Sequence, residues 1–271
     1  MKQKIMIAAL AFGLGAPAAF AIDLPFGGDA LHHQLRAASD VGLVTIAGKR
    51  PGAYACTLVE GLKGSLPVDF SVAADEPSMP ALRPGATYLL FLKPAGAPSR
   101  VDYRLAASIY SIQPASVRNL PAYRSAVHAY LAAAGDKGVL KASLRTLAAN
   151  PVAYVQYSAV ADLKHLGLIE AADLPWLTEL VSAGRLGDPR ARGIVARQIG
   201  RFGAREHTGL LEELVRKPGE SVSVKTDALE ALRAMGATAS LEGLRSTIEA
   251  SPALRLKMHN RAQREAKGGI S

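Results

Sequence analysis

Two adjacent histidines near the start of the chain, His32 and His33, are of a residue type that could bind a metal ion. Neighbouring side chains on a helix point about 100° apart, so this pair could chelate only with a further ligand such as Asp29 or Asp40. We therefore interpret the pair as the solvated end of a short helix expected over residues 30–38, and we predict no metal site. The remaining histidines are expected on helix surfaces or in C-terminal turns, where an imidazolium complements the helix dipole: His128, His165, His207 and His259.

The motifs of common catalytic sites are absent from the sequence. It contains no glycine-rich phosphate loop, no His-Glu-x-x-His, no Gly-x-Ser-x-Gly and no pair of cysteines. The single cysteine, Cys56, cannot form an internal disulfide, and we expect it to be a small buried strand residue. These features predict no cofactor and favour a protein that is not an enzyme.

A basic stripe is the best candidate for an interaction site. Arg190, Arg197 and Arg201 fall within about 40° of arc on a helix expected to begin at Pro189. If this helix is the second of a pair, the stripe lines the concave side of a curved helical array, where an acidic protein segment or polyanion could dock. The alternative is an ordinary solvated face. Nucleic acid is disfavoured, because aromatic residues do not alternate with the basic ones.

Three aromatic residues could serve either in binding or in packing. Trp176, Tyr154 and Tyr157 could anchor a partner, but aromatic side chains inside amphipathic helices more often fill the grooves between helices. We expect all three to be packing residues.

The start of the chain predicts a cleavable export signal over residues 1–21. Lys2 and Lys4 precede an apolar run at residues 5–14, and small residues follow up to Ala21. The run is shorter than the roughly 20 residues of a membrane span, so we expect cleavage after Ala21 and no stable membrane insertion. The mature chain would be periplasmic or secreted, and its formal net charge would fall from +9 to +7.

Composition divides the rest of the chain into two parts. Val, Tyr, Phe, Gly and Pro are common before about residue 118, whereas Ala, Leu, Arg and Glu dominate afterwards. The chain after the expected signal is longer than the roughly 100 to 150 residues of a typical domain. We predict an α+β protein with a β-domain at residues 22–118, a helical domain at 119–266 and a frayed tail at 267–271.

The first domain has the pattern of a small antiparallel β-barrel. Short runs with period-two alternation and turn residues between them predict strands at residues 41–47, 52–60, 67–73, 87–93 and 101–106, with a sixth candidate at 108–113. Closure into a barrel would remove the exposed edges of so small a sheet.

One sequence pattern in this domain resembles a known family. Leu62-Lys63-Gly64 is followed by Leu82, by Pro84-Gly85 and by Tyr88-Leu89-Leu90-Phe91-Leu92. The pattern is similar to that of exported bacterial domains related to the netrin-like, OB-type barrel of tissue inhibitors of metalloproteinases, over about residues 35–115. Those inhibitors bind the protease zinc through an N-terminal cysteine. The mature chain here would begin at Ile22-Asp23, so the resemblance implies the fold and not that mechanism.

The second domain contains internal repeats. Apolar residues recur in helical spacing before Gly135, Gly167, Gly203 and Gly236, which are 32, 36 and 33 residues apart. Glycine suits the left-handed residue that ends a helix. Helix starts are expected where a capping residue precedes a proline: Asn150-Pro151, Asp188-Pro189 and Ser251-Pro252.

Second helices are expected between the glycines and the caps, at residues 139–149, 174–183, 208–217 and 239–250. A helix pair at this period predicts an α-solenoid. The endings resemble HEAT repeats, whereas the Trp, Leu-Gly and Tyr positions of tetratricopeptide repeats are missing.

These features together predict an exported, non-catalytic protein that binds or scaffolds another protein, which could be acidic. The partner would lie on the concave face of the helices, on the barrel loops, or on both. The alternative is an envelope hydrolase or protease inhibitor that acts through barrel loops such as residues 74–83.

Overall fold

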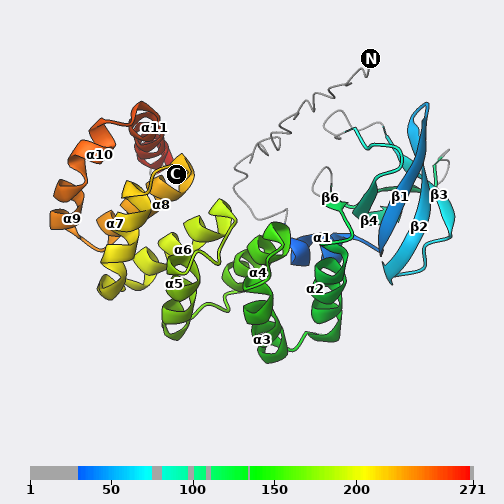
Figure 1. Ribbon diagram of the computed structural model, residues 1–271, viewed down its shortest axis with the longest axis horizontal. Helices are drawn as coiled ribbons and strands as arrows, with labels where there is room; N and C mark the ends of the chain where they lie inside the picture. The colour runs from blue at the N-terminus through cyan, green and yellow to red at the C-terminus, as the bar shows by residue number, and fades with distance from the viewer. Residues whose placement is uncertain (1–29, 75–80, 97–100, 108–110, 134, 269–271) are drawn as a thin grey trace, which may run out of the picture.

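The computed structural model describes residues 30–268 except 75–80, 97–100, 108–110 and 134. Figure 1 shows a small β-barrel at one end of the molecule and a curved succession of helices leading away from it. The expected signal segment, the possible metal ligand Asp29 and most of the loop at 74–83 lie outside the described residues. Within the described ranges, no helix is both long enough and apolar enough to cross a membrane.

The barrel occupies residues 40–115 and closes on itself. Its strands are β1 Asp40–Arg50, β2 Ala53–Lys63, β3 Asp69–Ala73, β4 Thr87–Pro94, β5 Tyr103–Leu105 and β6 Ile112–Ala115. They are ordered β1-β2-β3-β5-β4, and β4 pairs back to β1 to close the ring. Strand β6 also pairs with β4, along a different stretch of that strand from β5. The predicted closed barrel is therefore confirmed.

The expectation of a purely antiparallel barrel is wrong. Strand β5 is parallel to β3, with Val72 opposite Tyr103, and antiparallel to β4. The reason is topological. A closed ring of five strands cannot alternate direction all the way round, so one neighbouring pair must run parallel. Here the parallel pair is β3 and β5.

The barrel has its own apolar core. Val44, Ile46, Phe70 and Leu90 are among the side chains that fill it. Cys56 also lies there, 2% exposed, and burial raises the pKa of its thiol to about 12. The prediction of a small buried strand cysteine is confirmed.

The helical region follows the barrel. Its first members are α2 Leu120–Ala133, α3 Lys137–Ala148, α4 Ala153–His165, η2 Ala171–Asp173, α5 Leu174–Ser182 and α6 Pro189–Phe202. The remaining members are η3 Arg205–His207, α7 Thr208–Arg216, α8 Val222–Ala234, α9 Thr238–Gly243, α10 Arg245–Glu249 and α11 Pro252–Gly268. All four predicted terminal glycines adopt positive φ, between 64° and 91°, which confirms the predicted ends of α2, α4, α6 and α8.

Two of the three predicted helix starts are confirmed. Asp188 caps α6 through the backbone N–H of Arg190, and the Ser251 hydroxyl accepts from the N–H of Leu254 at the start of α11. The third prediction is wrong in detail. Asn150 accepts instead from the N–H of Val152, and the helix begins after the resulting turn, at Ala153.

The single helix predicted over residues 239–250 is two short helices. Helix α9 ends at Gly243 and α10 begins at Arg245, on either side of Leu244, which is fully buried. Glycine is a poor helix former because it loses more backbone freedom than other residues.

The long helices form two rows. In Figure 1, α4, α6 and α8 follow the inner side of a curve, and α3, α5 and α7 follow its outer side. Along the inner row α6 packs on both α4 and α8, and each inner helix packs on the outer helix that precedes it in the chain.

Buried acids link successive helix pairs. Asp173, at the start of α5, pairs with Lys141 and Arg145 of α3, at 2.8 and 2.9 Å. Glu220, before α8, pairs with Arg192 of α6 at 2.8 Å. Burial alone would raise the pKa of Glu220, but the hydrogen bonds and positive charge of Arg192 outweigh it and lower the pKa.

A short helix, α1 Leu31–Ala37, joins the barrel to the helical region. It packs on β4, on α2 and on α4. Leu31 and Leu35 belong to one continuous apolar core that includes Leu89 and Phe91 on the outside of the barrel and Val127 of α2. The two parts of the molecule therefore share a core.

Polar contacts fix α1 at its ends and along its side. The ammonium of Lys63, on β2, donates to the carbonyl oxygens of Leu35 and Ala38, at 2.7 and 2.6 Å. The backbone N–H of His32 donates to the carboxylate of Asp162 on α4, 3.1 Å away. These bonds connect α1 to both parts of the molecule.

Glycine allows two inner helices to approach closely. A Cβ atom at Gly200 of α6 would lie 2.7 Å from the Cα of Ala231 on α8 and 2.9 Å from its Cβ. Because real Cβ contacts are not so short, any side chain at residue 200 would push α8 away.

We predict opposite effects for two Gly→Ala substitutions. Gly200→Ala should lower the free energy of unfolding by about 1 to 3 kcal/mol through overpacking. Gly209→Ala on α7, where a Cβ meets nothing within 4 Å, should raise it by about 0.5 to 1 kcal/mol through helix propensity. Urea titrations of both variants measure the effect. Equal changes in the free energy of unfolding of the two variants would contradict the close approach of α6 and α8.

Candidate functional site

The predicted arginine stripe lies on α6, beside the inner helices α4 and α8. Arg190 is held by two neighbours. Its guanidinium lies 2.9 Å from the carboxylate of Asp188, and it stacks on the ring of Tyr157 of α4, 3.7 Å from the ring centroid. This geometry positions Arg190 as part of the helix cap and of the α4–α6 contact.

Arg197 is also paired. Its guanidinium lies 2.5 Å from a carboxylate oxygen of Asp227 on α8, whose side chain is only 4% exposed. Gly193, one turn earlier on α6, leaves room for that carboxylate. Removing Arg197 would leave a buried carboxylate without this partner.

Arg201 is the most open member of the stripe. It is exposed, and its guanidinium lies 3.5 Å from the amide oxygen of Gln198 and 5.4 Å from the ring centroid of Phe202. No carboxylate among the described residues is within ion-pair distance of it.

Lys164 of α4 joins this site, although no sequence motif marks it. Burial lowers its pKa, and the positive charges of Arg197 and Arg201 lower it further, against the opposing effect of Asp227. Among the described residues Lys164 has no carboxylate within ion-pair distance. We call Lys164, Arg190, Arg197 and Arg201 the basic face.

A matching spacing on the two helices could have identified Lys164. Tyr157 and Lys164 are seven residues apart on α4, as are Arg190 and Arg197 on α6. Residues seven apart lie on the same side of a helix. Since Arg190 stacks on Tyr157, Lys164 comes to lie near Arg197.

The basic face can bind an anion. Two of its four cations are paired with Asp188 and Asp227, and in the described part of the chain the other two have no carboxylate within ion-pair distance. Arginine and lysine N–H groups form strong charge-assisted hydrogen bonds with carboxylates and phosphates. A carboxylate near Lys164 and Arg201 would relieve the repulsion among the neighbouring cations.

The histidine pair does not form a metal site with Asp40. His32 is half-buried, and its pKa is lowered by burial and then by the charges of Arg36 and His33. Asp40 instead accepts hydrogen bonds from the Ser39 hydroxyl and the Ser65 N–H. In the described part of the chain, no three His, Cys, Asp or Glu side chains are grouped for a metal ion.

Three of the four remaining histidines lie on the surface, as predicted. His128, His165 and His259 are exposed. His207 is not. Its Nε2 is buried and has no hydrogen-bond partner in the described structure.

The aromatic residues are packing residues, as predicted. Tyr154 and Tyr157 are buried. Trp176 is half-buried beneath the guanidinium of Arg145, which lies 4.7 Å from its ring.

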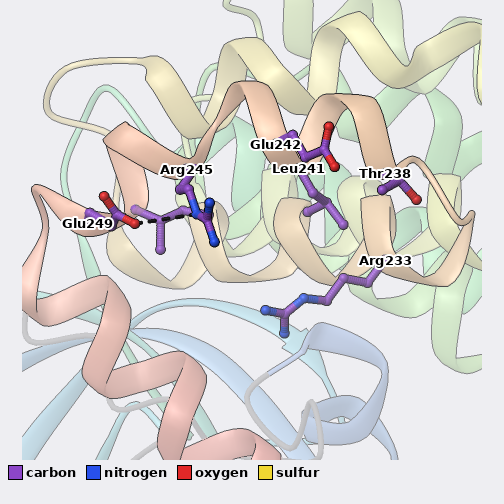
Figure 2. A pocket seen from close by; sticks show the side chains of 7 residues that line it. Arg233, Thr238, Leu241, Glu242, Arg245 and Glu249 are labelled. Atoms are coloured by element: carbon purple, nitrogen blue, oxygen red, sulfur yellow. Dashed lines mark ion pairs between the residues drawn. The ribbon is translucent and has the colours of Figure 1, made fainter.

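A second candidate lies near the end of the chain. A hollow of about 410 Å³ is lined by residues of α8, α9 and α10 (Figure 2): Arg233, Thr238, Leu241, Glu242, Arg245, Ile248 and Glu249. None of these residues was selected from the sequence, because no motif marks them.

Comparison of the chain with protein-family models, with curated proteins and with solved structures finds no match in any of the three. The chain is therefore described by its architecture: a closed five-stranded mixed β-barrel followed by a helical region.

We predict that Lys164→Gln stabilises the protein. Because the folded state disfavours charged Lys164, its removal should raise the free energy of unfolding at neutral pH, by less than about 1 kcal/mol since water screens the exposed part. As pH rises through the lowered pKa towards 10.5, Lys164 loses its proton in the folded state first. The free energy of unfolding of the wild type should therefore rise towards that of the variant.

Thermal unfolding at several pH values measures this effect, with Lys137→Gln as the control. Lys137 is exposed and pairs with no carboxylate among the described residues. Equal melting temperatures of the two variants at every pH would contradict the cost of holding charged Lys164, which comes first from its burial and then from the neighbouring arginines.

Proposed function

We propose that the protein binds another protein through the basic face, and that an acidic segment of the partner contacts Lys164 and Arg201. The observation that carries the proposal is the accumulation of four cations on α4 and α6, two of them without a carboxylate partner in the described structure. Such an arrangement attracts anions and raises the rate of encounter with them.

The position of the face supports a binding role. Helix α6 belongs to the inner row (Figure 1), and it packs on α4, α8 and the outer helix α5. Because these neighbours cover its other sides, we infer that the basic face, of which Arg201 is the exposed arginine, faces the inner side of the curve. Curved helical arrays commonly hold partners on such concave surfaces.

The shared core around α1 supports a scaffolding role. A partner that touches both the barrel and the inner helices would meet a surface already held in place, and less entropy is lost when a binding surface is pre-organised. Barrel loops could contribute additional contacts to such a partner.

The finer fold assignments are part of the proposal. We infer that the barrel is of OB type and netrin-like, because the β1-β2-β3-β5-β4 order with a parallel β3–β5 pair agrees with that type. We infer that the helices are HEAT-like repeats forming a solenoid, because four helices end at glycines about one repeat apart. An exported, periplasmic or secreted location follows from the expected signal at residues 1–21.

Retention of proteins from a bacterial envelope extract tests the proposed function. The wild type should retain a partner that Lys164→Gln/Arg201→Gln fails to retain. This pair is preferable to a variant lacking Arg197, because it leaves no buried carboxylate unpaired. The retained proteins are identified by mass spectrometry.

The matched control is Lys137→Gln/Arg118→Gln, which removes the same charge from exposed residues elsewhere. It should retain the partner as the wild type does, and the interaction should weaken as salt rises above about 0.15 M. If all three proteins retain the same set, or none retains any protein, the basic face is not the binding site.

A further inference from the structure

The hollow between α8, α9 and α10 arises from the break at Leu244. A continuous helix would bury one apolar face, as α7 does with Leu211, Leu214 and Val215. In contrast, neither α9 nor α10 contains a buried residue. Leu241 and Ile248 remain only half-buried, and they line the hollow.

Two guanidinium groups reach the hollow from different helices. Arg233, from the end of α8, and Arg245, from α10, both line it, and Figure 2 shows Leu241 beside Arg245 and above the Arg233 side chain. Arg233 is exposed and has no ion-pair partner among the described residues. Arg245 is 3.5 Å from Glu249, but both side chains are largely exposed, at 81% and 65%, so this pair is weak.

The size of the hollow matches a small ligand. Its lining combines two apolar side chains, Leu241 and Ile248, with Thr238 and with charged residues of both signs: Arg233, Arg245, Glu242 and Glu249. Its volume of about 410 Å³ is within the range of roughly 300 to 1,000 Å³ for small-molecule sites, which combine apolar walls with a few polar groups. The apolar side chains suit an aliphatic chain. The unpaired guanidinium suits a carboxylate, with which arginine forms two parallel hydrogen bonds.

We propose that this hollow binds a free aliphatic monocarboxylate, with the carboxylate on Arg233 and the hydrocarbon chain against Leu241 and Ile248. The site is separate from the basic face, and the proposal does not depend on the proposed function. Arg245 assists by exchanging its exposed contact with Glu249 for one with the ligand.

Calorimetric titration with octanoate tests this proposal directly. Octanoate should bind saturably to the wild type, and Arg233→Gln should weaken the affinity by about tenfold, the expected effect of losing one charge-assisted contact. Leu241→Asn should weaken it as well. Circular dichroism establishes that both variants fold; Arg233 is exposed, so its replacement leaves no cavity.

Two controls separate this site from general adsorption. Arg104→Gln removes an exposed arginine from β5 of the barrel and should bind octanoate as the wild type does. Octylamine, with the same chain length and the opposite charge, should bind at least tenfold more weakly. The proposal is overturned if octanoate gives no saturable heat, if octylamine binds equally well, or if Arg233→Gln binds like Arg104→Gln.

Discussion

Burial of α1 between the barrel and the inner helices is the contact on which the arrangement of the molecule depends. A helix of seven residues is too short to be stable alone. Leu31 and Leu35 are buried in the shared core, and full burial of such a side chain stabilises by roughly 1.5 to 3 kcal/mol. Hydrogen bonds from the Lys63 ammonium and to the Asp162 carboxylate then fix the position of α1. The barrel and helices are thereby joined into one body.

The helical region combines close packing with a few buried charges. Gly200 and Gly193 bring α6 and α8 together, and Asp173, Glu220 and Asp227 each receive a cation from the preceding helix pair. The basic face departs from this pattern, because Lys164 and Arg201 add charge without an acid within ion-pair distance among the residues that the structure describes. The proposed binding role rests on this local arrangement, since departures from the stable pattern are expected at functional sites.

The sequence predicts the barrel strands and the ends of the inner helices because each rests on a local signal: period-two alternation or a terminal glycine. It does not predict the direction of β5, which depends on how the ring closes. Leu131 is one of the apolar residues that recur in helical spacing before Gly135, yet it is 40% exposed. Periodicity identifies an apolar position, but it does not reveal whether a neighbour covers it.

The candidate site was predictable only in part. The arginine stripe follows from spacing on one helix, whereas Lys164 and the partners Asp227 and Tyr157 come from neighbouring helices. The hollow at α9 and α10 was missed because the sequence suggested one continuous helix. The role of α1 was missed as well, since a short amphipathic segment does not indicate what it will contact.

Denaturation monitored by two unique residues shows whether the barrel and the helices unfold together. Cys56 lies in the barrel core and Trp176 on α5, so thiol labelling follows barrel unfolding and tryptophan fluorescence follows helix unfolding. The shared core predicts one common midpoint for the wild type, and separate midpoints for Leu31→Ala/Leu35→Ala. Separate midpoints in the wild type, or an unchanged common midpoint in the variant, would contradict the account.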